Sequence, residues 1–200
     1  MHMSRSNGGM RLKVDPRIEI AECEDVYPPR EDSFLLLECT QVRNGERVLE
    51  MGCGSGVIAL HCAKAGALVT AVDINPRAVT CTRNNALQNG LEVEALHSDL
   101  FLDLDGSFDV MIFNPPYLPE EERGTIERSW AGGEGGTRVL ERFLREAPRH
   151  LNPRGRIYIL LSSMMRDASL SCVLSQFVRD RLRRKKLFFE ELWVEELRLP

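Results

Sequence analysis

The sequence lacks the features of several protein classes. Its 200 residues contain no run of 18 apolar residues, so we expect no membrane-spanning helix. The first ten residues, MHMSRSNGGM, lack the apolar core of a secretory signal, which indicates a soluble, cytoplasmic protein. The formal net charge of −4 argues against a protein that coats nucleic acid through a basic surface.

Metal-ligand spacings are also missing. The cysteines include no C-x-x-C pair, and no histidine stands at a ligand spacing from any of them. We therefore predict no metal site in this chain, and we expect most of the cysteines to be reduced, small core residues. They are Cys23, Cys39, Cys53, Cys62, Cys81 and Cys172.

Length and composition predict one globular unit. With 43% hydrophobic and 28% charged residues the chain can bury one core, and 200 residues are few for two domains. Residues 1–10 are polar and contain glycine. We expect them to be disordered and residues 11–200 to form a single domain.

Strands and helices are predicted to alternate along most of the chain. A short strand or hairpin is expected at 12–20, and a helix with two acids in its first turn at 30–41. Further strands are expected at 47–51, 68–73, 91–97, 108–113 and 156–161, and further helices at 57–65, 77–88 and 138–151. The alternation indicates an α/β fold, a doubly wound parallel sheet with helices on both faces.

The C-terminal third is less regular. A helix is predicted at about 167–177, and one or two strands within 186–199. Helical spacing of apolar residues continues through a basic cluster at 179–186. We interpret that cluster as a solvated helix end or loop, or as a phosphate-contacting segment.

A glycine-rich turn, Gly52-Cys53-Gly54-Ser55-Gly56, follows the strand at 47–51 and precedes a helix. Such glycines let the backbone approach a ligand beside a helix amino end. Position 57 is valine where a dinucleotide fingerprint has glycine, and Glu50 would repel a pyrophosphate. The carboxylate suits a cationic ligand, such as the amino acid end and sulfonium of S-adenosylmethionine.

Residues after the next two strands fit the rest of that ligand. Asp73 closes the second strand, where an acid can bind two ribose hydroxyls. Ile74 can pack against a purine ring. Asp99, with Leu100 beside it, is placed to meet the adenine amino group.

The strand at 108–113 stops at Asn114-Pro115-Pro116-Tyr117. Pro115 removes an N–H, the two prolines stiffen the loop, and Tyr117 supplies a planar face. The loop suits a planar –NH₂ group whose hydrogens are accepted by the Asn114 side chain and the Pro115 carbonyl. Holding both hydrogens turns the nitrogen lone pair toward a methyl donor, so positioning supplies much of the rate without a strong base.

These motifs resemble a known family, the HemK-type class I S-adenosylmethionine-dependent methyltransferases. The stretches VYPPREDSFLLLE (26–38) and IERSWAGGEGGTRVLERFL (126–144) are similar to its short archaeal and eukaryotic branch. The family methylates the glutamine side-chain nitrogen in the Gly-Gly-Gln motif of peptide-chain release factors. The resemblance covers about residues 25–162 and implies one Rossmann-like domain with a seven-stranded, mostly parallel sheet.

The resemblance also implies roles for single residues. Asn114, Pro115 and Tyr117 are the expected catalytic residues, and Pro116 joins them in binding substrate. Ser33 stands where the motif often has threonine, and it keeps the hydroxyl. With the assignments above, the expected cofactor-binding residues are Tyr27, Pro28, Ser33, Glu50, Gly52, Gly54, Asp73, Ile74, Asp99, Leu100 and Asn114.

Two further expectations concern macromolecules. Members of this branch are commonly activated by a small zinc-binding partner, and the segment 91–95, an edge strand in the usual order, can pair with another chain. We therefore expect a heterodimer. The loop at 129–136 is expected to close over substrate with Trp130 as an anchor, or else to be a surface loop with Trp130 in the core.

Other functions stay open. The NPPY motif also occurs in RNA and DNA amino-methyltransferases, so a base amino group is a second substrate hypothesis, supported by the basic cluster and opposed by the net negative charge. A protein lysine is a further possible acceptor. A cofactor-binding scaffold without turnover is a third hypothesis, against which the intact set of Glu50, Asp73 and Asn114 argues.

Overall fold

The computed structural model describes residues 9–116, 137–165 and 168–200. The expectations for Tyr117 and for the loop at 129–136 with Trp130 fall outside these ranges, as do residues 1–8. Met10, expected to be disordered, instead begins a short strand, β1 (Met10–Arg11), which pairs with β2 (Gln41–Val42).

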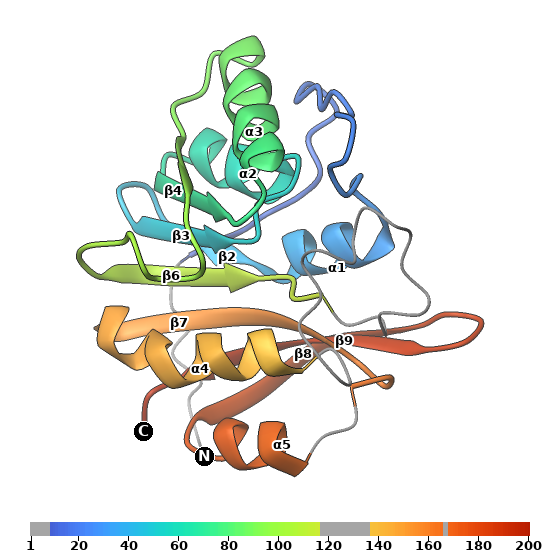
Figure 1. The fold of residues 1–200 in the computed structure, drawn as a ribbon, viewed down its shortest axis with the longest axis vertical. Coiled ribbons are helices and arrows are strands. Elements are labelled where there is room, and N and C mark those ends of the chain that lie inside the picture. The colour runs from blue at the N-terminus through green and yellow to red at the C-terminus, as the bar shows by residue number, and fades with distance from the viewer. Residues whose placement is uncertain (1–8, 117–136, 166–167) are drawn as a thin grey trace.

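A seven-stranded sheet forms the centre of the molecule, with strand order β5-β4-β3-β6-β7-β9-β8 (Figure 1). β9 runs antiparallel to both of its neighbours, and the other pairs are parallel. The predicted mostly parallel α/β sheet is therefore confirmed. The strands are β3 (Arg47–Met51), β4 (Leu68–Asp73), β5 (Glu94–His97), β6 (Phe108–Phe113), β7 (Leu151–Ser162), β8 (Val178–Lys186) and β9 (Glu191–Arg198).

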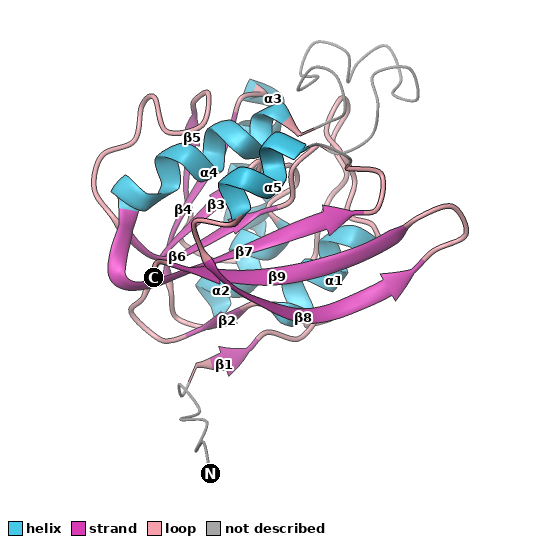
Figure 2. Cartoon of the chain, turned by 90° about the horizontal axis from the view of Figure 1, so that it is seen from below, coloured by secondary structure: helices cyan, strands magenta, loops and turns pink. Residues whose placement is uncertain are grey.

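Helices cover both faces of this sheet. Along β6, Val110 and Ile112 join a buried cluster with α1 and α2, whereas Met111 and Phe113 join a second cluster with α4 and α5. Figures 1 and 2 show α1 and α2 on one side and α4 and α5 on the other. The helices are α1 (Glu31–Cys39), α2 (Val57–Lys64), α3 (Pro76–Gln88), α4 (Arg138–His150) and α5 (Ala168–Leu174). Among the residues described, no helix is long and apolar enough to cross a membrane.

The prediction of a strand or hairpin at 12–20 is wrong. The backbone of this segment bonds to side chains in and next to helices: the Asp15 N–H donates to His61 Nε2 of α2 at 3.0 Å, and the Glu19 N–H donates to Oδ1 of Asn89, the C-cap residue of α3, at 2.9 Å. Because helix side chains supply the acceptors, the segment needs no strand partner. We call residues 12–29, which cross α2 and α3 before α1 begins, the strap.

The basic cluster is not a helix end or loop. It forms β8, the last strand of the sheet, where Figure 2 shows it beside β9. α5 ends at Leu174, so the helical spacing beyond it was misleading. Four of the cluster's arginines make ion pairs: Arg179 and Arg181 with Glu195, Arg183 with Glu38, and Arg184 with Glu191. β7 also starts earlier than predicted, because Leu151–Asn152 extend the strand rather than turn.

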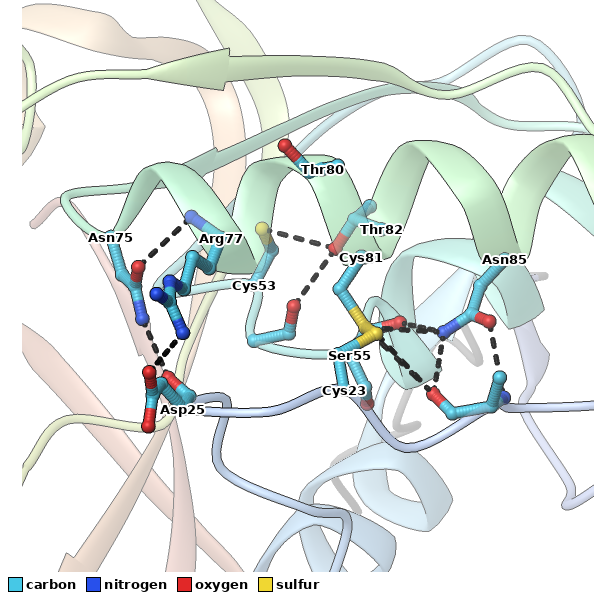
Figure 3. The surroundings of a disulfide bond; sticks show 12 residues. Cys23, Asp25, Cys53, Ser55, Asn75, Arg77, Thr80, Cys81, Thr82 and Asn85 are labelled. Carbon is cyan, nitrogen blue, oxygen red and sulfur yellow. Dashed lines mark hydrogen bonds and ion pairs between the residues drawn. A yellow bond between two sulfur atoms is a disulfide. The ribbon is translucent and has the colours of Figure 1, made fainter. Parts of the chain in front are cut away.

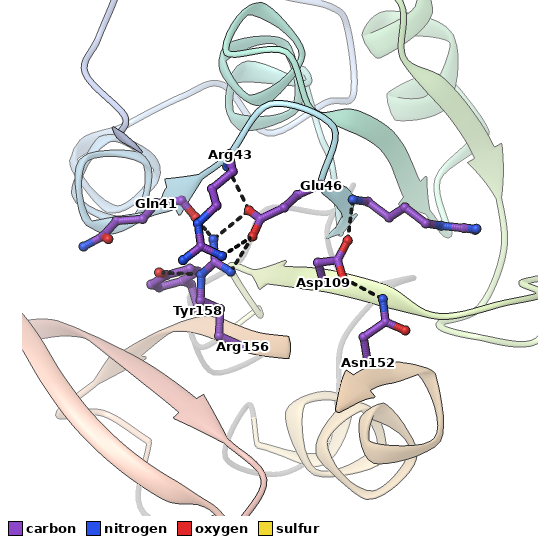
Figure 4. A network of polar contacts seen from close by, with 8 residues as sticks. Gln41, Arg43, Glu46, Asp109, Asn152, Arg156 and Tyr158 are labelled. Carbon is purple, nitrogen blue, oxygen red and sulfur yellow. Dashed lines mark hydrogen bonds and ion pairs between the residues drawn. The ribbon is translucent and has the colours of Figure 1, made fainter. Parts of the chain in front are cut away.

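A buried ion pair fastens β7 at the end of the sheet opposite the glycine turn (Figure 4). The Arg156 guanidinium donates to both Glu46 oxygens at 2.8 and 3.0 Å and to the Gln41 carbonyl at 2.7 Å. The Arg43 N–H also donates to Glu46, at 2.8 Å. Because each charge is paired and hydrogen-bonded, their burial is tolerated.

The cysteines follow the prediction only in part. Cys39, Cys53 and Cys62 are free and buried, as expected, whereas Cys172 is free and exposed. Cys23 of the strap and Cys81 of α3 form a disulfide bond, which their separation of 58 residues did not reveal. The fold brings them together because the strap runs along α3.

Candidate functional site

The site lies where the sheet reverses its strand order. β3 and β6 are parallel neighbours, and Met51 pairs with Phe113 at their carboxyl ends. A Cβ added at Gly52 would lie 3.9 Å from the Asn114 carbonyl oxygen and 3.4 Å from the Phe113 ring. The glycine turn and the Asn-Pro-Pro segment therefore stand side by side, as expected at a topological switch point.

Two residues of α3 hold the glycine turn in shape (Figure 3). The Thr82 hydroxyl donates to the Gly54 carbonyl at 3.1 Å, and Asn85 Nδ2 donates to the Ser55 carbonyl at 2.9 Å. Gly56 has φ +79°, and a Cβ there would lie 2.8 Å from Thr82 Cγ2. Glycine is therefore required at position 56 by both conformation and space.

The strap closes the other side of the turn. Asn75, the N-cap residue of α3, donates through Nδ2 to the Asp25 carbonyl at 2.8 Å, and Arg77 pairs with the Asp25 carboxylate (Figure 3). The disulfide fixes the strap two residues earlier. As a result the Tyr27 carbonyl lies 3.6 Å from the position of a Cβ at Gly54.

Asp73 links the glycine turn to the start of α3. Its two oxygens accept from the Gly54 N–H at 3.0 Å and from the Asn75 N–H at 2.8 Å. Burial raises the pKa of Asp73 above its ordinary value, while these two N–H groups act in the opposite direction. A ligand that donates hydrogen bonds to Asp73 would favour the ionised form.

Glu50 lies beneath the turn and is 4% exposed. Its Oε2 accepts from the Ala59 N–H in the first turn of α2 at 2.8 Å. Burial raises the pKa of Glu50 to about 8; this N–H bond lowers it, and the neighbouring Asp73 charge raises it further. A buried and a half-buried carboxyl group, both with raised pKa, on neighbouring strands are suited to a ligand that carries positive charge.

Asn114 presents a free acceptor. Its Nδ2 donates to Asp32 Oδ2 at 3.0 Å, across 82 residues of sequence. Its Oδ1 is buried and has no hydrogen-bond partner among the described residues. A buried acceptor without a partner costs free energy, so a donor from a bound molecule is expected there.

Other predicted site residues differ in their surroundings. The Ser33 hydroxyl donates to Asp32 Oδ1 at 3.2 Å, and the Asp99 carboxylate pairs with Arg142 of α4 at 2.9 Å. Ile74 is exposed, as a residue awaiting a ring would be. Leu100 is buried with φ +55°, a strained conformation for leucine that turns the chain after Asp99.

Sequence reasoning missed Asp32, Thr82 and Asn85 as site residues. Each carries a readable signal, a polar side chain on the buried stripe of a helix. Asp32 is on the same face of α1 as Leu35, Leu36 and Cys39, spaced by three, four and seven residues. Thr82 and Asn85 share a face of α3 with Ala78 and Ala86. Asp32 was interpreted only as a first-turn acid.

The described residues include no set of side chains arranged to bind a metal ion. In the ranges 9–116, 137–165 and 168–200, no group of three or more histidine, cysteine or acidic side chains could hold a metal ion. The arrangement offers instead one buried and one half-buried acid, a turn that a ligand can approach closely, and an oriented amide oxygen.

Comparison with known proteins gives a family and close relatives. Residues 31–183 match the family model described as the methyltransferase small domain. A Methanocaldococcus jannaschii protein, provisionally named as a protein N5-glutamine methyltransferase, is 40% identical over 194 residues, covering 93% of this chain and 94% of the relative. Methyltransferase HEMK2 of Mus musculus is 41% identical over 152 residues, which cover 68% of this chain and 71% of the mouse protein.

A solved structure is similar over nearly its whole length. It is a chain of the E. cuniculi Mtq2–Trm112 complex, responsible for the methylation of the eRF1 translation termination factor. The TM-score is 0.68 at 25% identity, with 88% of this chain and 99% of that chain covered.

Proposed function

Since the chain belongs to the methyltransferase small domain family, we propose that it methylates a release factor. The methyl group passes from S-adenosylmethionine to the side-chain amide nitrogen of the glutamine in the Gly-Gly-Gln motif. The names of the M. jannaschii and E. cuniculi relatives support this substrate class.

One observation carries the proposal: the buried Oδ1 of Asn114, beside the glycine turn, accepts no hydrogen bond from the residues that the structure describes. A primary amide has two N–H donors, and Asn114 Oδ1 accepts one of them. The Pro115 carbonyl is next in the chain and accepts the other. With both hydrogens held, the glutamine nitrogen is aimed into the site, and Pro116 and Tyr117 complete the wall of the amide site.

The residues at the carboxyl ends of β3 and β4 fit the methyl donor. When bound, S-adenosylmethionine supplies a methyl group on a cationic sulfur. Glu50 and the glycine turn receive the charged amino acid end, and Asp73 accepts from the ribose hydroxyls. Ile74 covers the purine face, while Tyr27 and Pro28 of the strap close the pocket.

Four further residues have roles that the relatives' names do not address. Asp99 accepts from the adenine amino group once its ion pair with Arg142 loosens, and Leu100 packs beside the purine. Ser33 contacts the cofactor from the first turn of α1. We also propose that Trp130, which lies outside the described residues, contacts the substrate.

The reaction needs alignment more than base catalysis. The amide nitrogen attacks the methyl carbon in line with the C–S bond, and the electrons of that bond go to sulfur. A carbon–nitrogen bond forms, and one N–H proton leaves to water. Asn114 and Pro115 hold the nitrogen throughout, and this supplies the orientation.

The test is methyl transfer from labelled donor to a recombinant release factor, with mass spectrometry to locate the methyl group. We expect it on the glutamine of Gly-Gly-Gln and expect no incorporation when that glutamine is replaced by alanine. Asn114→Ala should slow methyl transfer severely, to a residual rate followed by single-turnover incorporation, while retaining cofactor binding. Methyl incorporation only into RNA, or only into lysine, would refute the proposal. Cofactor binding without turnover in the wild-type protein, unchanged by Asn114→Ala, would indicate a scaffold.

We further propose a small protein partner on the free edge of β5. β5 ends the sheet, as predicted for the segment 91–95, although the strand itself covers Glu94–His97. An unpaired edge can accept a strand from another chain. The E. cuniculi relative was solved with Trm112, and we propose a zinc-binding partner of that kind in the cytoplasm. Co-purification tests this, and full activity of the isolated monomer would contradict it.

A further inference from the structure

Asp32 connects three segments of the site. Its Oδ1 accepts from the Ser33 N–H at 2.7 Å and the Ser33 hydroxyl at 3.2 Å, both within α1. Its Oδ2 accepts from the Tyr27 hydroxyl of the strap at 3.2 Å and from Asn114 Nδ2 at 3.0 Å. One oxygen therefore serves the helix, and the other reaches the strap and the loop after β6.

The stability of α1 explains only the hydrogen bonds that Asp32 Oδ1 accepts. Acids in the first turn of a helix are stabilised by its dipole, and exposed Glu31 already occupies that turn. Asp32 is 3% exposed. Burying a carboxylate is costly unless hydrogen bonds compensate, so a residue needed only for the dipole would stay at the surface.

The contact with Asp32 fixes which way the Asn114 amide faces. A carboxylate only accepts hydrogen bonds, so the –NH₂ end of Asn114 must point at it, and Oδ1 must point away. The reverse orientation would bring two acceptor oxygens together. Asp32 thus accounts for the buried acceptor that the described residues leave open at the carboxyl end of β6.

The charge of Asp32 has a second effect. A negative charge next to the Asn114 –NH₂ group polarises the amide and makes Oδ1 a stronger acceptor. During methyl transfer the substrate nitrogen gains positive charge, so its N–H bond to Oδ1 strengthens most in the transition state.

We propose that Asp32 is a positioning residue for methyl transfer, acting through Asn114. It orients the Asn114 oxygen toward the substrate nitrogen and strengthens that oxygen as an acceptor. The inference rests on the proposed function for its substrate, but the hold of Asp32 on Asn114 does not depend on it.

The kinetic test compares Asp32→Asn with Glu31→Gln, its neighbour in the same helical turn. Asp32→Asn keeps the size and removes the charge. We expect kcat to fall about 10- to 100-fold, as for residues that orient a reacting group, with the release-factor KM and the cofactor Kd changed less than about threefold. Glu31→Gln should leave all three unchanged. Equal kcat in the two variants would overturn the inference.

A double-mutant cycle separates action through Asn114 from a general structural effect. If Asp32 works through Asn114, then Asp32→Asn should slow the Asn114→Ala enzyme less than about twofold, measured by single-turnover methyl incorporation. An equal slowing in both backgrounds would mean that Asp32 acts elsewhere.

A third measurement needs no turnover. In labelled protein, the side-chain –NH₂ resonances of Asn114, assigned from their loss in Asn114→Ala, should shift in Asp32→Asn and stay in place in Glu31→Gln. Unmoved resonances would refute the contact even if the enzyme is active. If the wild-type protein methylates no release factor, the proposed function fails, and the resonances still decide whether Asp32 holds Asn114.

Discussion

Cys23 and Cys81 join the strap to α3 by a disulfide bond across 58 residues of sequence. Closing a loop of that length removes entropy from the unfolded chain, which stabilises the fold by about 3 kcal/mol in typical cases. We expect reduction to lower Tm on the order of 10 °C, measured by calorimetry with and without dithiothreitol. Because the strap carries Tyr27, reduction should also weaken cofactor binding several-fold.

The control for this prediction is another cysteine. Cys172→Ser, at an exposed free thiol, should keep the difference in Tm between oxidised and reduced protein. Cys81→Ser should abolish that difference. Titration of six thiols in the unreduced, denatured protein would show that no disulfide forms.

Cofactor affinity should rise with pH because of Glu50. The pKa of about 8 means that the free protein holds this proton at pH 6, whereas a cationic ligand favours the ionised carboxylate. Binding therefore releases a proton, and the affinity should increase by up to about tenfold per pH unit until pH 8, then level off. Titration calorimetry in buffers of different ionisation enthalpy measures both the cofactor affinity and the number of protons released on binding.

Glu50→Gln is the matched variant for this experiment. It cannot ionise, so its binding should be weaker at pH 8 and free of the Glu50 contribution to the pH dependence. Any titration of the ligand itself remains in both proteins and cancels in the comparison. The same pH profile for both would show that Glu50 does not meet the charge.

Gly56→Ala should destabilise the protein by about 3 kcal/mol, combining a positive φ with a clash against Thr82. Gly90→Ala provides the comparison, since Gly90 has φ +62° but no atom within 4 Å of an added Cβ. That variant should lose about 1 kcal/mol in urea unfolding. Cofactor affinity should fall only for Gly56→Ala, and equal losses in the two variants would exclude the clash.

The basic strand β8 should not bind RNA tightly. Its arginines at 179, 181, 183 and 184 are paired with glutamates. Of the cations of β8, only Lys185 and Lys186 lack an ion pair with another described residue. With about two free cations, the slope of log K against log salt should be near −2 in a filter-binding assay. A slope of about −5 or steeper, made shallower by about 2 in the Lys185→Gln and Lys186→Gln double variant, would favour the base-methylation hypothesis.

The regular part of the fold could be predicted from the sequence because its patterns are local. Strands such as Phe108–Phe113 and helices such as Arg138–His150 each have one consistent pattern of hydrophobic residues and clear boundaries. The strap and β8 could not be predicted in this way. The strap is ordered by distant side chains such as His61, and β8 carries outward cations whose partners, including Glu38 and Glu195, are far away in the chain.

The residues of the site also divide into those that a local pattern predicts and those that depend on distant contacts. Gly52, Glu50, Asp73 and Asn114 stand at strand ends, and parallel strands bring such ends together whatever the side chains are. Asp32 became a site residue only through a contact with Asn114 that crosses 82 residues, and no local pattern encodes that distance. A polar residue among the buried positions of a helix is the sequence signal that identifies such a site residue. Thr82 and Asn85 carry the same signal.

The two outer strands of the sheet differ in a way that directs assembly. β8 is nine residues long with mostly exposed side chains, and its Lys185 and Lys186, unpaired among the described residues, would meet the same two lysines of a second copy approaching that border. β5 is four residues long and bears no comparable charge. A sheet that repels strands on one border and tolerates them on the other cannot propagate, so its association should stop at a single added chain.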